Sequence, residues 1–233
     1  MPILRDLEID VQLHDLLMLL GAKPERVQLY EQMLELSQNV LAELPSLVRP
    51  AAIYDVFDVS HAEPARLVLR DGHAFESHIV ATQLAQAQQI AVAVCTIGPL
   101  VEEQSSRAFD EGRSLEGLVL DNAGSLALDC LSLAVVKHLQ NVAASRGLQA
   151  SVSIQPGSRD SALEDQAVIR ELLPTEEIDV TLTEGLLLKP LKSLSLLVGY
   201  GHDMPEPEQV LQCHGCPRRQ DCAFAHLRER ECV

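Results

Sequence analysis

Apolar residues recur every three or four positions along the first 45 residues, and this spacing predicts two helices. Gly21 matches a helix stop, and Pro24 is typical of the first turn of the next helix, which we expect to end at Pro45. Two helices joined in this way form a hairpin, for which we expect a packing role. The predicted apolar faces are Ile9, Leu13, Leu16, Leu17 and Leu20 in the first helix, and Val27, Tyr30, Met33, Leu34 and Leu41 in the second.

The pattern changes from residue 51 onward, where apolar and polar residues begin to alternate. Residues 53–59 alternate at period two, and residues 65–69 form a second candidate strand before the turn signal Asp71-Gly72. A helix is expected over residues 78–88. The run 90–96 is almost entirely apolar, which is typical of a strand that is buried on both faces.

The segment Ile97-Gly98-Pro99 should end that strand, and Glu102-Glu103 favour the first turn of a following helix. Residues 115–139 form a long helix whose apolar side chains cover most of its circumference. We therefore expect this helix in the centre of the molecule, closed by Arg146-Gly147. The remaining predicted elements are a strand at 150–155, a helix at 162–173 ended by Pro174, and strands at 180–183 and 193–198 separated by a bend at Lys189-Pro190.

Helices and strands follow one another without the regular rhythm of a doubly wound fold. This mixture favours an α+β fold with an at least partly antiparallel sheet. We expect an N-terminal helical hairpin over residues 1–48, an α+β domain over residues 49–205, and a cysteine-rich tail over residues 206–233. The core must be built from Leu, Val, Ile and Ala, because aromatic residues make up only 3% of the 233 residues and Trp is absent.

The charge balance narrows the classes of partner. The chain has 18 basic and 34 acidic residues, a net charge of −16, which argues against nucleic-acid binding through phosphate neutralisation. No apolar run approaches the roughly 20 residues of a membrane span. The N-terminus is polar and acidic, unlike a signal peptide. We therefore expect a cytoplasmic protein with no membrane and no nucleic acid among its partners.

Four of the six cysteines lie in the last 21 positions, with the spacing Cys213-x2-Cys216-x5-Cys222-x9-Cys232. A Cys-x2-Cys pair can present two thiolates to one metal ion, and two further thiolates complete a tetrahedral set. Thiolates suit zinc or an iron–sulfur cluster, and the spacing does not separate the two. His214 or His226 could also replace Cys232. The other two cysteines, Cys95 and Cys130, stand in apolar runs and are expected to be core thiols.

Three further segments carry candidate chemistry. Gln155-Pro156-Gly157-Ser158-Arg159-Asp160 places a Pro-Gly turn after a predicted strand, where backbone N–H groups can meet a ligand. Glu184 follows a predicted strand, so its carboxylate could hold a ligand ammonium or hydroxyl group. Asp121 and Ser125 share a helix face, and Gly124 between them permits close packing of the helix on a sheet. The sequence has no phosphate-binding loop of the Walker type and no G-x-S-x-G elbow.

In their order along the chain, these segments resemble one family, the stand-alone relatives of the activation domain of cobalamin-dependent methionine synthase. The resemblance covers nearly the whole chain and rests on Thr96-Ile97-Gly98-Pro99, Asp121-x-x-Gly124-Ser125, Pro156-Gly157, Leu182-Thr183-Glu184 and the terminal cysteines. It implies an α+β fold with a bent, mostly antiparallel sheet and flanking helices. It also implies S-adenosylmethionine binding and docking on a corrinoid-binding protein or a methionine synthase subunit, so that cobalamin enters only through the partner.

The resemblance assigns S-adenosylmethionine to Pro156, Gly157, Ser158, Asp160 and Glu184. The family's turn usually reads Arg-x-x-Pro/Ala-Gly-Tyr, and here Ser153 and Ser158 occupy the Arg and Tyr positions. Arg159 could supply the missing positive charge from a shifted position. Three hypotheses follow for the function. The chain is an accessory protein for reductive reactivation of a cobalamin-dependent methyltransferase, a scaffold that has lost its ligand, or a small redox protein whose terminal cysteines carry a metal or cluster.

Overall fold

The structure is a computed structural model that describes residues 1–157, 161–204 and 224. Its centre is a seven-stranded sheet in which every pair of neighbouring strands is antiparallel, in the order β4-β3-β2-β5-β9-β6, with β1 also paired to β2. The strands are β1 (Ile3–Leu4), β2 (Ala51–Glu63), β3 (Arg66–Leu69), β4 (Ala74–Phe75), β5 (Gln89–Thr96), β6 (Gln149–Ala150) and β9 (Ser193–Gly201).

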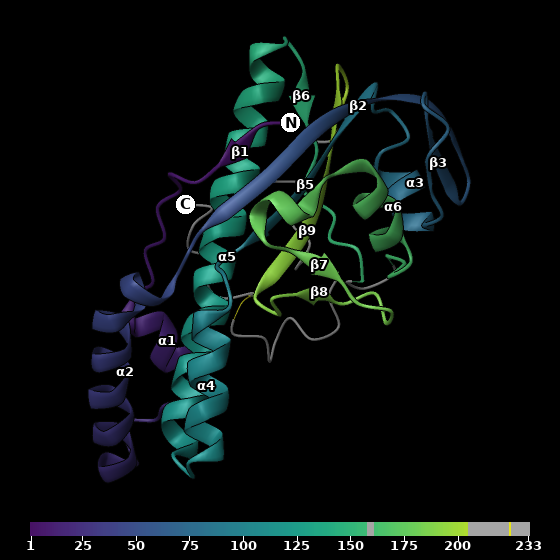
Figure 1. Cartoon of the computed structure of the whole chain (residues 1–233). Coiled ribbons are helices and arrows are strands. Elements are labelled where there is room, and N and C mark those ends of the chain that lie inside the picture. The colour runs from purple at the N-terminus through teal and green to yellow at the C-terminus, as the bar shows by residue number, and fades with distance from the viewer. Residues whose placement is uncertain (158–160, 205–223, 225–233) are drawn as a thin grey trace.

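Strand β2 gives the sheet its bend. Its first half pairs with β5, and its second half pairs with β3 after a bulge between Val59 and His61. A bulge inserts an extra residue, which bends the strand and increases its twist. Figure 1 shows β2 running from the helical side of the molecule out to β3. The predicted bent antiparallel sheet is therefore confirmed.

Both faces of the sheet are covered, which explains the unbroken apolar run of β5. Its side chains alternate between two hydrophobic clusters. Ala91, Ala93 and Cys95 pack in the cluster that contains α5, and Ile90 and Val92 in the cluster that contains α6. The helices are α1 (Leu13–Leu19), α2 (Val27–Leu47), α4 (Leu100–Asp110) and α5 (Ser114–Ser145) on one face, and α3 (His78–Gln83), α6 (Asp165–Leu172) and the 3-10 helix η1 (Thr175–Ile178) on the other.

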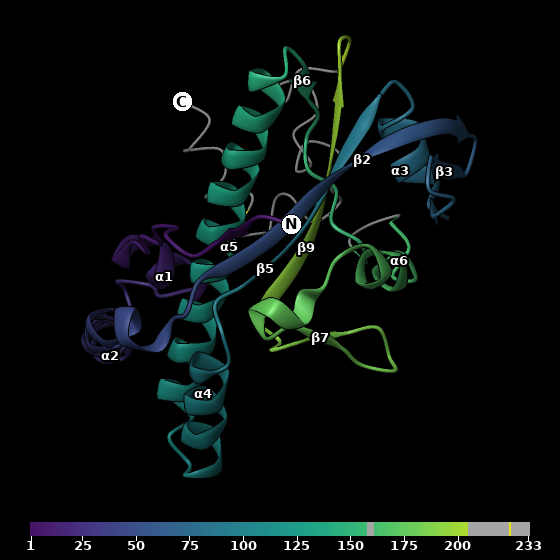
Figure 2. The ribbon, with the colours of Figure 1, turned by 45° about the horizontal axis from the view of Figure 1, so that its top comes forward.

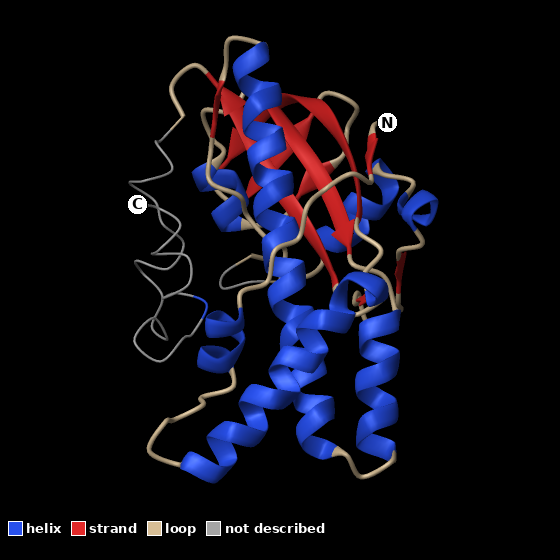
Figure 3. Cartoon of the chain, turned by 90° about the vertical axis from the view of Figure 1, so that its left-hand side faces the viewer, coloured by secondary structure: helices blue, strands red, loops and turns tan. Residues whose placement is uncertain are grey.

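Helix α5 is the central helix, as its apolar circumference predicts. It lies across the sheet, while α1, α2 and α4 pack against it (Figures 1 and 3). Leu120, Ala127 and Leu131 are 4%, 0% and 0% exposed. By length and composition α5 is also apolar enough to cross a membrane, contrary to the expectation from the sequence. Half of its most apolar 18-residue stretch is buried inside the fold. The core helix of a soluble protein can have the same length and composition.

The helical hairpin is confirmed, with two corrections. Gly21 ends the first helix at a φ of +65°, a conformation that favours glycine. Helix α2, however, continues through Pro45 to Leu47. Pro45 cannot donate a hydrogen bond to the preceding turn, and its ring crowds the carbonyl there, but only two helical residues follow it, so the disturbance is confined to the last turn. Val27 is 62% exposed and not part of the buried stripe, whose members are Met33, Ser37, Val40, Leu44 and Leu47.

Smaller elements differ from the prediction as well. The expected strand at 150–155 is reduced to β6 and a single bridge between Ile154 and Leu197. A short hairpin of β7 (Thr181–Leu182) and β8 (Leu188–Lys189) precedes β9, and the Lys189-Pro190 peptide after it is cis. Strands β1, β4 and β8 were not predicted, because two-residue strands carry too few positions to show a period of two.

Candidate ligand-binding site

The predicted ligand turn leaves the sheet beside β9. Ile154 and Leu197 exchange two backbone hydrogen bonds of 2.8 Å, which fix the chain just before the turn. Pro156 is buried, whereas Gly157 is exposed and has a φ of +82°. A Cβ atom on Gly157 would approach Leu163 Cδ1 to 2.9 Å. Glycine is therefore favoured by the backbone conformation, and a larger residue would in addition have to displace the Leu163 side chain.

Glu184 lies at the tip of the β7–β8 hairpin, and its side chain is exposed. The Thr183 N–H donates to the carbonyl of Leu187 at 2.9 Å, and the Leu187 N–H donates to Thr183 Oγ1 at 3.0 Å. These bonds close the turn and leave the Glu184 carboxylate facing solvent. Strand β7 packs against α6, and Figure 2 shows both on the side of β9 opposite α5.

The structure therefore places Pro156, Gly157 and Glu184 on the same side of the sheet, around α6. The other predicted ligand residues, Ser158 and Asp160, lie outside the described residues. The predicted metal ligands Cys213, Cys216, Cys222 and Cys232 also lie outside them. Among residues 1–157, 161–204 and 224, no group of three or more His, Cys, Asp or Glu side chains is arranged to hold a metal ion.

Asp165, the first residue of α6, is a buried carboxyl group that the sequence did not single out. It is 1% exposed, and Oδ1 accepts the Glu76 N–H at 3.0 Å. Burial raises its pKa from 3.8 to about 6, although the bond from Glu76 acts in the opposite direction. Three buried oxygens before and along the first turn of α6 have no hydrogen-bond partner in the described structure, namely Ser161 Oγ, Asp165 Oδ2 and Gln166 Oε1.

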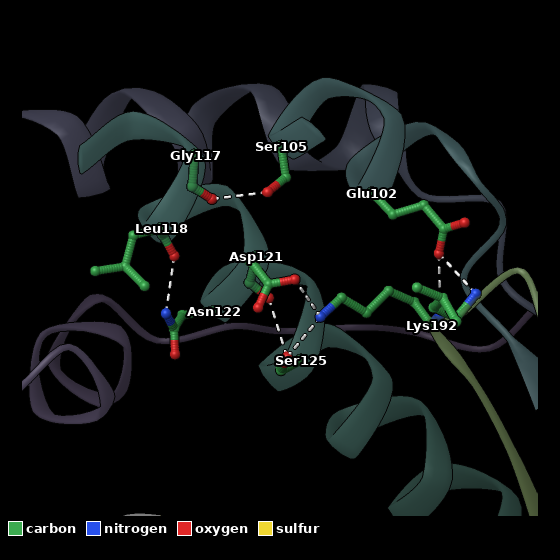
Figure 4. Close-up of polar contacts among 9 residues, drawn as sticks. Glu102, Ser105, Gly117, Leu118, Asp121, Asn122, Ser125 and Lys192 are labelled. Carbon is green, nitrogen blue, oxygen red and sulfur yellow. Dashed lines mark hydrogen bonds and ion pairs between the residues drawn. The ribbon is translucent and has the colours of Figure 1, made fainter. Parts of the chain in front are cut away.

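A second polar cluster is centred on Lys192, between α5 and the start of β9 (Figure 4). Lys192 Nζ lies 2.8 Å from Asp121 Oδ1 and donates to Ser125 Oγ at 2.8 Å. Its side chain is 13% exposed. On the other side, Glu102 Oε2 accepts the Leu191 N–H at 2.6 Å and the Lys192 N–H at 3.3 Å. One lysine thus joins α4, α5 and the segment between β8 and β9.

The same cluster includes the end of β5. The Ile97 N–H donates to the Lys192 carbonyl at 3.1 Å, and Ser193 Oγ donates to Thr96 Oγ1 at 2.9 Å. Thr96 Oγ1 also accepts the Gly98 N–H at 3.0 Å. The segments Thr96–Pro99 and Asp121–Ser125, far apart in the sequence, therefore meet at Lys192.

Gly124 permits a close contact, but not the predicted one with the sheet. A Cβ atom at Gly124 would lie 2.7 Å from Val101 Cγ1 and 3.3 Å from Lys192 Cε. The close neighbour is thus α4, together with the Lys192 side chain. The expectation was wrong because a glycine permits close approach without specifying which element approaches.

The two cysteines predicted to be core thiols differ in burial. Cys95 is completely buried, as predicted, and burial raises the pKa of its thiol to about 12, so it carries no thiolate near neutral pH. Cys130 is only half-buried on α5, and its Sγ lies 3.4 Å from the Asp10 carbonyl. Neither cysteine belongs to the candidate site.

The Lys192 cluster predicts a specific loss of stability. We expect Lys192→Met to lower the free energy of unfolding by about 1–2 kcal/mol, because hydrogen bonds from a charged group contribute more than neutral ones. Asp121 is half-exposed, so solvent weakens its ion pair with Lys192 and keeps the loss small. Lys189→Met, at an exposed lysine of β8, is the matched control and should have little effect. Urea denaturation measures the free energy of unfolding of both variants. Equal stability of the two would show that the cluster contributes nothing.

The fold and these contacts define a class: an α+β domain with a bent antiparallel sheet, a long central helix, and two turns beside α6. Neither a scan against known protein families nor a search of the curated proteins finds a match. Among solved structures, the chain is similar to the MetH reactivation domain bound to AdoHcy, with a TM-score of 0.56 and 15% sequence identity. The similarity covers 76% of this chain and 66% of that one. The chain therefore has the fold of that reactivation domain.

Proposed function

We propose that this protein binds S-adenosylmethionine and serves as an accessory protein for the reductive reactivation of a cobalamin-dependent methyltransferase. The observation that carries the proposal is the shared fold with the MetH reactivation domain, a domain whose structure contains AdoHcy. The ordered sequence segments that resemble the same family support it independently. In this proposal the partner is a corrinoid-binding protein or a methionine synthase subunit, and both work in the cytoplasm.

The described residues near the turn fit such a ligand. S-adenosylmethionine carries an ammonium group, ribose hydroxyls and an adenine amine, all of which donate hydrogen bonds. The unpartnered oxygens of Ser161, Asp165 and Gln166 are acceptors within a few residues of Leu163, which touches the Gly157 turn. Buried acceptors without a partner are rare in proteins, and a ligand with several donors would satisfy them.

We assign the ligand to Pro156, Gly157, Ser158, Asp160 and Glu184. The backbone of the Pro156-Gly157 turn would meet the ligand's carboxylate or ribose, and the exposed Glu184 carboxylate would hold its ammonium or a hydroxyl group. When bound, S-adenosylmethionine supplies a methyl group. The methyl acceptor would be the cobalt of the partner's cobalamin after a separate electron donor has reduced it, and S-adenosylhomocysteine would leave. In this proposal the chain contributes binding and docking.

A second candidate function is a scaffold that keeps the fold without the ligand. The observation in its favour is Ser153, which stands half-buried at the position of the family's arginine and offers no positive charge. Losing a charged hydrogen bond of about 1.5–3 kcal/mol corresponds to a roughly tenfold or greater loss of affinity. The two functions differ in one measurable property, namely saturable binding of S-adenosylmethionine.

We expect Gly157→Ala to weaken S-adenosylmethionine binding by about tenfold or more, because a methyl group there strains the backbone at a φ of +82° and also forces the Leu163 side chain to move, so that the turn shifts. Gly147→Ala is the matched control: its φ of +71° is similarly positive, and nothing lies within 4 Å of a Cβ at that position. Isothermal titration calorimetry on both variants separates the local effect from general backbone strain. Equal affinities of the two variants for S-adenosylmethionine would show that the turn is not part of the binding site.

For the tail, we propose that Cys213, Cys216, Cys222 and Cys232 hold zinc or an iron–sulfur cluster. Cys216→Ser should remove most of the bound metal and leave the far-UV circular dichroism of the main domain unchanged. Cys130→Ser, which keeps all four tail thiols, is the control. Metal and sulfide analysis of anaerobically purified protein distinguishes zinc from a cluster, which would absorb visible light. Full metal content after the Cys216 substitution would contradict the site.

A further inference from the structure

A pocket lies at the end of strand β5 opposite the Lys192 cluster. Gln89, at the start of β5, lines it, whereas Thr96, at the other end of β5, contacts the Lys192 cluster. Seven residues of strand separate the two ends by about 23 Å. The pocket has a volume of about 620 Å³, which lies within the range of small-molecule sites. Its position is not explained by the proposed S-adenosylmethionine site.

The charge of this pocket is opposite to that of the protein. Its lining contains two arginines and two histidines, Arg70, Arg146, His61 and His202, but only one acidic residue, Asp58. The whole chain has 34 acidic and 18 basic residues. A concave site lined by one sign of charge concentrates ions of the other sign. In an acidic protein, this reversal indicates a site for an anion.

Two hydrogen bonds and one longer ion pair connect the polar side chains of the pocket in a row. Arg146 NH1 donates to Gln89 Oε1 at 3.1 Å, and Gln89 Nε2 donates to Asp58 Oδ1 at 2.8 Å. Asp58 Oδ2 lies 3.8 Å from Arg70 NH1. A guanidinium group has five N–H donors, and the bond to Gln89 uses only one of those on Arg146. Both arginines are thus oriented by neighbours and keep donors for a ligand.

The backbone shapes the same place. The bulge of β2 between Val59 and His61 lies in the pocket wall, together with the Gln88-Gln89 start of β5. Bulges are frequent beside functional sites, where they redirect side chains. The remaining lining combines apolar side chains with the polar side chains of Ser60 and Gln88. It therefore suits an organic ligand larger than a bare ion.

We propose that this pocket binds a small organic phosphate, whose phosphate group pairs with Arg70 and Arg146. Arginine presents a planar fork of donors that matches phosphate oxygens. The pocket is large enough for a phosphate monoester with a sugar-sized body. The proposal is independent of S-adenosylmethionine binding and holds whether or not that function is correct.

Ribose 5-phosphate, with uncharged ribose as its control, tests the proposal by calorimetry at low salt. We expect saturable binding of ribose 5-phosphate that weakens as salt rises, and no binding of ribose. Arg146→Gln and Arg70→Gln should each weaken binding by about tenfold. Arg70 is 73% exposed, so its replacement does not threaten folding. Arg107→Gln, on α4 and outside this pocket, changes the net charge equally and should have no effect.

Several outcomes would overturn the proposal. Absence of ribose 5-phosphate binding at about 10 mM would exclude a site of useful affinity. Equal weakening by Arg107→Gln would attribute binding to net charge instead of the pocket. Equal affinity for inorganic phosphate would reduce the site to an ion site, and tighter binding of citrate would contradict the preference for phosphate. Binding that is strong, phosphate-dependent and lost only in the Arg70 and Arg146 variants would confirm it.

Discussion

Replacing Leu131 with Ala should lower the free energy of unfolding by about 2–5 kcal/mol, the largest effect we expect from one side chain. Leu131 is 0% exposed on α5, within the cluster that joins this helix to the sheet. Truncation removes buried apolar surface and leaves a cavity that the surrounding side chains fill only in part. Urea denaturation followed by far-UV circular dichroism measures the loss.

Leu118→Ala provides the matched control for this substitution. Leu118 lies on the same helix but is 43% exposed, so the same chemical change should cost less than about 1 kcal/mol. Both substitutions change helix propensity equally, so the difference between their free energies of unfolding reports the effect of burial. Equal losses in the two variants would contradict the central position of α5 in the core.

The second large effect depends on pH and on Asp165. Its pKa rises from 3.8 to about 6 on folding, because burial disfavours the charged form. The folded state therefore binds the proton more tightly than the unfolded state, and stability falls as pH rises from about 4 to about 6. A pKa difference of this size lowers the free energy of unfolding at pH 7 by about 3 kcal/mol relative to pH values below 4. Asp165→Asn should remove this fall in stability while keeping an oxygen that accepts the Glu76 N–H.

Asp110→Asn, at an exposed carboxylate near the end of α4, is the control for this prediction. We expect the control to follow the pH dependence of the parent protein, and Asp165→Asn to gain relative stability between pH 4 and pH 7. Denaturant unfolding at pH 4, 5, 6 and 7 gives the curves. Parallel curves for the parent protein and the Asp165 variant would show that the carboxyl group is not buried as described.

The long elements of the fold could be predicted from the sequence because their patterns are strong. The alternation at 53–59 and the apolar run at 90–96 became β2 and β5, and residues 115–139 became most of α5. The bend in the sheet followed from family resemblance alone. Periodicity does not encode it, because it depends on one bulge in β2 and on the pairing of β2 with two different strands.

The polar contacts were harder to predict, because they join residues that are distant in the sequence. Asp121 and Ser125 were recognised as neighbours on one helix face, but their partner Lys192 lies 67 residues beyond Ser125. Asp165 resembled an ordinary charged residue at the start of a helix. Only the tertiary structure shows that Glu76, 89 residues away, contributes a hydrogen bond and that the carboxyl is enclosed.

We propose that the fold retains a site for S-adenosylmethionine. Calorimetric titration of S-adenosylmethionine into the anaerobically purified protein measures this binding. We expect saturable binding of one ligand per chain with a dissociation constant below about 1 mM. Absence of heat and of any thermal shift at millimolar ligand would contradict the claim and favour a scaffold that has kept the fold without the ligand.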